Sequence, residues 1–291
     1  MLSLWYISET VKELCAYPSS VALLLKGARQ VGRCIDEQRR NKWASNPVRV
    51  KHVHGFNMFL NPEDLDVCSS IGTIGQYESH VTALFRKLLR RSRTVVDIGA
   101  NVGWYTLQAA KILGKDASVI AFEPHPYNFQ LLRKSLTYNN FDFVRAFQEC
   151  VSDIDGTIPL YLDDDDHMGG HTTIKQDAIL KSISVPSVRL DTVLSEMGIG
   201  EVDILKIDVE GAEPKVIEGA GRSLASTRNI IMEWTQQRWN QVHLLDELSA
   251  LFDFYEIVQS PFLIRRVSVS SLFKKSNQVR NLYLQRRSSV A

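Results

Sequence analysis

Apolar runs of strand length alternate along the chain with segments of helical spacing. Thr94–Ile98 is a short β-branched run between basic residues and Gly99, which is typical of a strand buried on both faces. Beyond Gly103, apolar positions recur at roughly helical spacing as far as Gly114, a residue type that often ends helices. The pattern predicts a strand, a glycine turn and a helix, with the turn at the sheet edge where open α/β folds bind ligands.

The same alternation continues in both directions from this unit. Buried strands are predicted at Ser118–Glu123, Phe143–Gln148, Val202–Ile207 and Asn229–Trp234, and helices at Tyr77–Leu89, Tyr127–Asn139, Leu190–Met197, Pro214–Glu218 and Asn240–Phe252. Further predicted strands are a hairpin in Val48–Leu60, a hairpin of Cys150–Ser152 with Thr157–Leu162, an edge-like strand at Ile183–Val188 that contains Pro186, and a closing antiparallel hairpin of Tyr255–Gln259 with Asn281–Leu284. The fold class is therefore α/β, with a mostly parallel sheet, helices on both faces and a C-terminal antiparallel hairpin.

Residues 1–47 are predicted to form a helical extension, followed by one domain over residues 48–291. Leu4, Ile7 and Val11 give the extension an amphipathic helical pattern. It is read either as a cap packed on the domain or as a lid or homodimer element. The apolar run Val21–Leu25 ends at Lys26, far short of a membrane span, and no secretory signal is recognisable.

Composition and net charge argue against several classes of protein but do not by themselves indicate a function. Hydrophobic residues make up 44% and charged residues 23% of the 291 residues, an ordinary globular composition. A formal net charge of +1 gives no global attraction to nucleic acid. The four cysteines are scattered without a C-x-x-C pair, so they are read as reduced thiols of a cytoplasmic protein, without a zinc site or disulfide framework.

The glycine turn and two acid-ended strands indicate a nucleoside cofactor. The turn is not the dinucleotide fingerprint G-x-G-x-x-G, because Asn101 occupies its second glycine position. A tighter turn without a pyrophosphate cradle suits S-adenosylmethionine better than NAD. Asp97 ends the first strand, and Glu123 follows Gly99 by 24 residues, where an acid can bind the two ribose hydroxyls of an adenosine. Glycines 99 and 103 would let the backbone approach the ligand closely.

A second informative stretch, Val202–Glu213, supplies the predicted catalytic groups. Glu213 is assigned to a helix cap, whereas Asp208 and Glu210 leave a buried strand at the ligand edge and are assigned to the site. His171, beside two glycines in a loop, is a further proton-transfer candidate. The acidic run Asp163–Asp166 is read as a solvated turn rather than a metal site.

These residues together resemble the FkbM family of S-adenosylmethionine-dependent methyltransferases. The resemblance covers roughly residues 50–260 and is carried by Tyr77-Glu78, Val96–Gly103, Phe122–Pro124, Val151–Asp153 with Gly156, Leu190-Asp191, Leu205–Glu213, Gly219-Ala220 and Glu233. It implies a class I, Rossmann-like domain with a seven-stranded sheet, and O-methylation of a hydroxyl, often on a sugar or polyketide-type natural product. The cofactor-binding residues that follow are Glu78, Asp97, Gly99, Ala100, Asn101, Gly103, Glu123, Pro124, Val151, Ser152 and Asp208. Gly169–Thr173 departs from the serine pair that family members often carry, so the role of that loop stays open.

The expected reaction is in-line attack of a substrate oxygen on the cofactor methyl group, with S-adenosylhomocysteine as product. Asp208 is the first candidate for the base, His171 the second, and Glu210 shares the site. No metal is expected, because Asp208 and Glu210 lack an obvious third ligand. Two alternatives remain: an RNA ribose 2′-O-methyltransferase, since Lys206, Asp208 and Glu210 echo a Lys/Asp/Glu arrangement, and a non-catalytic cofactor-binding module. The acceptor is expected to be a small molecule or glycan hydroxyl, without nucleic acid.

Overall fold

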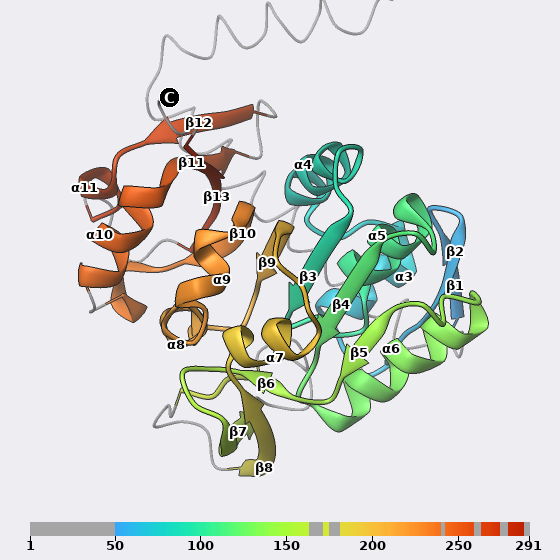
Figure 1. Cartoon of the computed structure of the whole chain (residues 1–291). Coiled ribbons are helices and arrows are strands. Elements are labelled where there is room, and N and C mark those ends of the chain that lie inside the picture. The colour runs from blue at the N-terminus through green and yellow to red at the C-terminus, as the bar shows by residue number, and fades with distance from the viewer. Residues whose placement is uncertain are drawn as a thin grey trace, which may run out of the picture. The chain divides into compact units, whose positions relative to one another are not determined.

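An eight-stranded sheet is the centre of the computed structural model (Figure 1). The structure describes residues 50–162, 171–174, 181–239, 242–258, 263–273 and 279–287; the predicted extension 1–47 and the run Asp163–Asp166 lie outside these residues. The strand order is β12 (Leu263–Val267), β11 (Phe252–Val258), β13 (Arg280–Arg286), β10 (Thr227–Trp234), β9 (Val202–Ile207), β3 (Thr94–Ile98), β4 (Ser118–Phe122) and β5 (Arg145–Phe147). Five neighbouring strands from β10 to β5 run parallel, and β13 joins them antiparallel.

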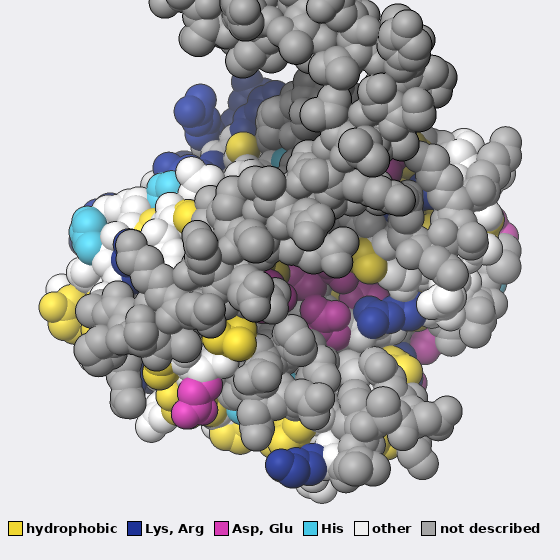
Figure 2. All heavy atoms as spheres, turned by 180° about the vertical axis from the view of Figure 1, so that it is seen from behind, with side chains coloured by type: hydrophobic (Ala, Val, Ile, Leu, Met, Phe, Trp, Pro, Cys, Tyr) yellow, Lys and Arg dark blue, Asp and Glu magenta, His cyan; other side chains and the backbone are white. Residues whose placement is uncertain are grey.

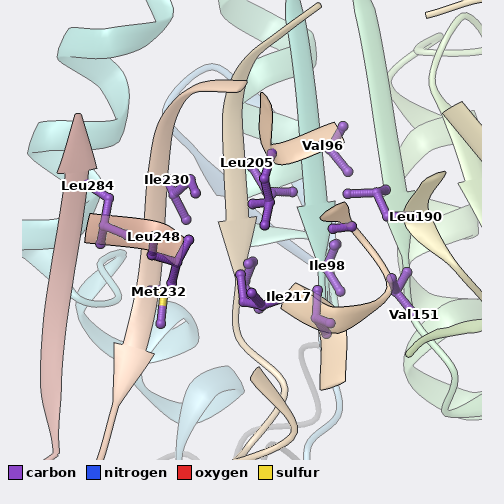
Figure 3. Close-up of a cluster of buried hydrophobic side chains, with 14 of the residues drawn as sticks. Val96, Ile98, Val151, Leu190, Leu205, Ile217, Ile230, Met232, Leu248 and Leu284 are labelled. Carbon is purple, nitrogen blue, oxygen red and sulfur yellow. The ribbon is translucent and has the colours of Figure 1, made fainter. Parts of the chain in front are cut away.

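Helices cover both faces of this sheet. On one face, α7 (Leu190–Glu196), α8 (Glu213–Glu218) and α10 (Val242–Leu251) bury apolar side chains against alternate residues of the central strands (Figure 3). Val96 and Ile98 of β3 and Leu205 of β9 point into this core. On the opposite face lie α4 (Ser79–Leu89) and α5 (Trp104–Leu113). Strand residues of the other parity, including Asp97 and Lys206, therefore face α4 and α5.

The remaining elements surround the carboxyl ends and the flank of the sheet. The hairpin β1 (Val50–Val53) and β2 (Phe56–Phe59) packs on α6 (Pro126–Tyr138). A separate three-stranded sheet has the order β6 (Cys150–Val151), β8 (Lys181–Val188) and β7 (Gly156–Leu162). Shorter helical pieces are α3 (Val67–Ile74), α9 (Gly221–Ala225), η1 (Gln236–Arg238) and α11 (Val269–Leu272). No helix in the described part of the chain is long and apolar enough to cross a membrane.

The α/β class, the parallel core and the antiparallel pairing of β11 with β13 are confirmed, and three expectations need correction. The sheet has eight strands rather than seven, because β12 adds to its edge. The hydrophobic pattern misses β12, whose arginines instead make cross-strand ion pairs with Glu256 and Asp253 of β11. Cys150–Val151 does not form a hairpin with β7, because β8 lies between them. Strand β8 is consequently not an edge strand; its Pro186 is tolerated because β6 pairs only with the two residues that follow it.

Candidate functional site

A cavity of about 300 Å³ opens at the carboxyl ends of β3, β4 and β9. Figure 2 shows Asp and Glu side chains gathered in a hollow near the middle of one face of the molecule. The predicted site residues that line the cavity are Gly99, Ala100, Asn101, Glu123, Pro124, Val151, His171, Asp208 and Glu210. The structure therefore brings the two informative stretches of sequence to one place.

Close contact between the β3 and β9 ends explains why glycine stands at position 99. The Asp208 amide donates a hydrogen bond to the Ile98 carbonyl at 3.0 Å, which continues the parallel pairing past the strand ends. Gly99 has a φ of +78°, and a Cβ there would lie 1.8 Å from the Asp208 carbonyl oxygen. A side chain at position 99 would force apart the loops that follow β3 and β9, so glycine is needed for these two segments to pack together.

Glu123 is held with both carboxylate oxygens oriented. Its Oε2 accepts a hydrogen bond from the Asn101 amide at 2.7 Å, and its Oε1 accepts one from the His125 amide at 2.9 Å. Asn101 adopts a left-handed φ of 51°, which aims its amide at the carboxylate. Burial raises the pKa of Glu123 to about 7, against the effect of the two amide donors. Each oxygen keeps a second lone pair, so the carboxylate can still accept hydrogen bonds from a diol.

Four predicted cofactor residues do not line the cavity, and two of them support its wall from beneath. Asp97 is 1% exposed and accepts a hydrogen bond from the Thr106 hydroxyl at 2.6 Å; burial raises its pKa to about 6. Glu78 has a φ of 40° and accepts hydrogen bonds from the Tyr105 hydroxyl at 2.7 Å and the Asn281 amide group at 3.1 Å. Both carboxylates thus anchor α5, the helix that follows the glycine turn.

The other two, Gly103 and Ser152, are needed for packing. Gly103 has a φ of +95°, and a Cβ there would approach Leu132 Cδ1 to 2.5 Å. The Ser152 hydroxyl donates to Asp153 at 2.8 Å, and its carbonyl oxygen would lie 1.9 Å from a Cβ at Gly219. The expected close backbone approach at position 103 is therefore to α6 rather than into the cavity.

A buried lysine carries the positive charge under the acidic end of the cavity. Lys206 is 1% exposed, and its Nζ donates a hydrogen bond to Asp208 Oδ2 at 2.8 Å. The same Nζ lies 4.9 Å from the centre of the Tyr105 ring. Burial alone would lower the pKa of Lys206, but the carboxylates of Asp208, Glu78 and Asp97 hold it above its ordinary value. The lysine is therefore a permanent cation.

Three carboxylates cluster above this lysine. Oxygens of Asp208, Glu210 and Glu233 all lie within 4.8 Å of one another. Burial, and next the Asp208 charge, raise the pKa of Glu210 to about 8 and raise that of Glu233 as well. Glu210 also has a strained φ of 52° and faces Arg238 Nη1 at 3.9 Å. Such a cluster can share a proton, and its oxygens are also of the kind that bind hard divalent cations.

His171 lies at the other end of the cavity. Its ring centre is 4.3 Å from that of His125, the residue whose amide binds Glu123. Its neighbour Thr172 exchanges backbone hydrogen bonds with Tyr161 at 2.8 and 3.1 Å, which fixes the segment to β7. This position places His171 beside the predicted ribose-binding acid.

Several lining or supporting residues were not predicted as site residues, although Tyr77 and Glu233 are among those that carry the family resemblance. Glu233 completes the carboxylate cluster, and Tyr77, Tyr105, Asp66 and Asn128 line the cavity. Glu233 carries the same signal as Glu123, an acid near the end of a buried strand. Its relevance depends on β10 lying next to β9, which the chain order alone does not fix.

Comparisons with known proteins identify the family of the chain. The model of the methyltransferase FkbM domain matches residues 97–260, which is more than half of the chain. The 2-O-methyltransferase NoeI of Sinorhizobium fredii is 28% identical over 186 residues, covering 57% of this chain and 74% of that protein. The 31-O-demethyl-FK506 methyltransferase FkbM of Streptomyces tacrolimicus is 30% identical over 159 residues, covering 45% and 60%.

Among solved structures, precorrin-6y C5,15-methyltransferase from Geobacter metallireducens is 12% identical with a TM-score of 0.40, covering 72% of this chain and 90% of that one. That likeness is too low to bear on the site. The family match spans both the glycine turn and the Asp208–Glu213 stretch. The chain belongs to the FkbM-domain methyltransferases, and it is a methyltransferase with a class I, Rossmann-like fold.

Proposed function

We propose that the chain is an S-adenosylmethionine-dependent O-methyltransferase that acts on a hydroxyl of a small molecule or glycan. One observation carries the proposal: Glu123, whose two carboxylate oxygens are both held by backbone amides, and the carboxylates of Asp208 and Glu210 line the same cavity. The printed names of two relatives, a 2-O-methyltransferase and a 31-O-demethyl-FK506 methyltransferase, support an oxygen acceptor. S-adenosylmethionine would supply an electrophilic methyl group on a sulfonium.

The cofactor end of the cavity is assigned to Glu123 and its surroundings. Glu123 would accept hydrogen bonds from the two ribose hydroxyls, since both of its oxygens are already oriented by backbone amides. Val151 and His171 line the cavity on the same side and would contact the adenosine. We therefore assign His171 to cofactor binding rather than to proton transfer. Asp97 and Glu78 act through α5 and are positioning residues.

The acid end would receive the acceptor. During transfer, the bond between acceptor oxygen and methyl carbon forms, the sulfur–carbon bond breaks with its electron pair passing to sulfur, and the hydroxyl proton must leave. Holding the oxygen in line can contribute about 7–11 kcal/mol to lowering the barrier. Because Asp208 is already ion-paired with Lys206, we assign the proton to Glu210, whose pKa near 8 suits a general base. Asp208 would orient the hydroxyl and keep that pKa high.

The test separates cofactor binding from methyl transfer. Calorimetric titration with S-adenosylhomocysteine should give a micromolar or tighter dissociation constant, and Glu123→Ala should weaken binding at least tenfold. Glu247→Ala, an exposed acid on α10, is the matched control and should leave binding unchanged. Methyl transfer from labelled S-adenosylmethionine to a panel of sugars and hydroxylated natural products should then show turnover. Absence of cofactor binding by the folded protein would refute the proposal.

A divalent cation could perform the step assigned to Glu210. The cluster of Asp208, Glu210 and Glu233 offers suitable oxygens, which the sequence alone did not reveal. Assays with EDTA, followed by added Mg²⁺ or Mn²⁺, distinguish the two routes. Turnover that survives EDTA supports the general base, whereas turnover abolished by EDTA and restored by metal would assign proton loss to a bound cation.

The site and the family bear on both alternative functions. The family disfavours a non-catalytic module. An RNA ribose acceptor would need a basic groove with exposed aromatic faces, whereas the cavity is lined by Asp66, Asp208 and Glu210. The cytoplasmic location and a homodimer formed through residues 1–47 stay predictions.

A further inference from the structure

A second groove, of about 670 Å³, adjoins the wall of the cavity. Tyr77 and Trp104 line both spaces. The groove is otherwise formed by α4, by the β1–β2 turn at His54 and by the end of α5 at Ile112. It therefore lies next to the proposed acceptor end, on the side of the sheet covered by α4 and α5.

The groove carries unbalanced positive charge. Arg86, Lys87 and Arg90 line it, and none of its lining residues is acidic. Within the described part of the chain these three make no ion pair, whereas Arg228, Arg265 and Arg266 elsewhere are each paired with a carboxylate. Among the described residues, Arg86 donates a hydrogen bond to the neutral Gln108 side chain, at 3.1 Å, and to no carboxylate. Figure 2 shows Lys and Arg side chains gathered at the upper left, over the place of α4 in Figure 1.

A helix C-terminus alone does not account for this charge. Cations in the last turn of α4 are favoured by the helix dipole, but Arg86 and Arg90 are four residues apart, and like charges at that spacing destabilise a helix. One further cation comes from another element: Lys111 of α5 lies against Gly55 of the hairpin turn, whose His54 lines the groove. Burial and the charge of Arg86 lower the pKa of His54, so this ring adds hydrogen-bonding nitrogens rather than charge. The cations of α4, with Lys111 nearby, make a concave basic surface that suits an anion.

We propose that this groove binds an anionic group, a phosphate or a carboxylate, of the methyl acceptor. The inference rests on the proposed function, because it needs the acceptor hydroxyl to enter the neighbouring cavity. Asp66, Asp208 and Glu210 would repel an anion there, so an anionic acceptor requires a counter-charge outside the cavity. The groove supplies that charge next to the two aromatic residues that it shares with the cavity. The proposed acceptor therefore carries a neutral hydroxyl at one end and an anionic group at the other.

The shape of the groove favours a small anion over nucleic acid. Trp104 is 2% exposed, its Nε1 donates to the Thr82 hydroxyl at 2.8 Å, and its ring meets His54 edge-on at 5.4 Å between ring centres. An indole held in this way offers no free face on which a base could stack, and stacking platforms are what single-strand binding proteins use.

The experiment is a calorimetric titration of the full chain with inorganic phosphate and with acetate, comparing wild type, Lys87→Glu/Arg90→Glu and Arg133→Glu/Lys134→Glu. Lys87 and Arg90 are exposed, and Arg133 and Lys134 are an exposed basic pair on α6 outside the groove. We expect wild type and the α6 variant to bind at least one of the two anions at millimolar concentration, and the groove variant to bind it at least tenfold more weakly. Equal binding by all three proteins, or no binding of either anion by wild type, would overturn the proposal.

Two controls separate this outcome from others. S-adenosylhomocysteine should bind all three proteins alike; its failure to bind wild type counts against the proposed function, independently of the anion result. A single-stranded RNA decamer that binds through Lys87 and Arg90 and is not displaced by phosphate would assign the groove to nucleic acid and overturn the proposal. With a working acceptor, phosphate should raise the acceptor KM and leave kcat unchanged. If phosphate instead raised the KM of S-adenosylmethionine, the groove would not be part of the acceptor site, and the proposal would be overturned.

Discussion

Replacing Lys206 by methionine removes the buried cation under the carboxylate cluster and keeps the side chain's length. Lys206 is 1% exposed and lies 2.8 Å from Asp208, whose side chain is 20% exposed. At that distance the Coulomb energy is about 6 kcal/mol with an effective dielectric constant of 20. Burial of the ammonium offsets part of this energy. Removing one partner of a buried pair costs about 3–5 kcal/mol, and we expect the lower end because water reaches Asp208.

Thermal unfolding followed by circular dichroism at pH 8 measures this loss. For a domain of this size, about 3 kcal/mol corresponds to a fall in Tm of about 6–12 °C. Lys87→Met, which removes an exposed lysine that forms no ion pair with another described residue, is the matched control and should change Tm by no more than 1 or 2 °C. Lowering the pH to 6 should shrink the loss, because the neighbouring carboxylates then take up protons.

The double variant Lys206→Met/Asp208→Asn isolates the pair. It leaves no charged Asp208 unpaired, so it should be more stable than Lys206→Met alone, with a coupling free energy of about 1–3 kcal/mol. Equal stability of the single and double variants, or a Tm of Lys206→Met within 2 °C of wild type, would refute the claim that this lysine compensates the cluster.

Four further variants test the remaining assignments. Glu210→Gln should lower turnover by about 10²–10⁴-fold with little change in the S-adenosylhomocysteine dissociation constant; unchanged turnover would remove Glu210 from proton transfer. Asp208→Asn removes a charge that raises the pKa of Glu210, so the rising limb of the pH–rate profile should move below pH 8. Gly99→Ala should prevent folding or lower Tm sharply because its Cβ would lie 1.8 Å from Asp208, whereas Gly221→Ala, with open space and a helical position, should be neutral or stabilising. The raised pKa of Glu123, about 7 against an ordinary 4.5, means that the folded chain holds a proton that the unfolded chain has lost; stability should fall by about 1.4 kcal/mol per pH unit as the pH rises from 4.5 to 7. Glu123→Gln should flatten that slope in a comparison of unfolding at pH 5, 6 and 7.

The hydrophobic pattern predicted most of the fold because each central strand is a short, mostly apolar run that is followed by a glycine or an acid. Thr94–Ile98, Ser118–Phe122 and Val202–Ile207 all form strands within a residue of their predicted limits. The pattern fails where ion pairs replace apolar contacts, as in β12. It also misplaced Cys150–Val151, because the choice between β7 and β8 as its partner depends on tertiary packing.

Part of the candidate site could be predicted from the sequence, because it is built at the ends of the apolar strands. Acids at strand ends must meet at one sheet edge, so Glu123 and Asp208 could be placed together. Local sequence does not determine which strand lies beside β9, so the place of Glu233 in the site could not be predicted. Side-chain directions could not be predicted either. Asp97 points towards Thr106 and away from the cavity, and Leu132 occupies the space next to the Cα of Gly103.

A crystal structure with bound S-adenosylhomocysteine tests the central claim most directly. We predict ribose hydroxyls within hydrogen-bond distance of the Glu123 carboxylate and a sulfur atom facing the open space beside Asp208 and Glu210. Adenosine bound away from the carboxyl ends of β3 and β4, or a sulfur turned from the Asp208–Glu210 pair, would contradict the account.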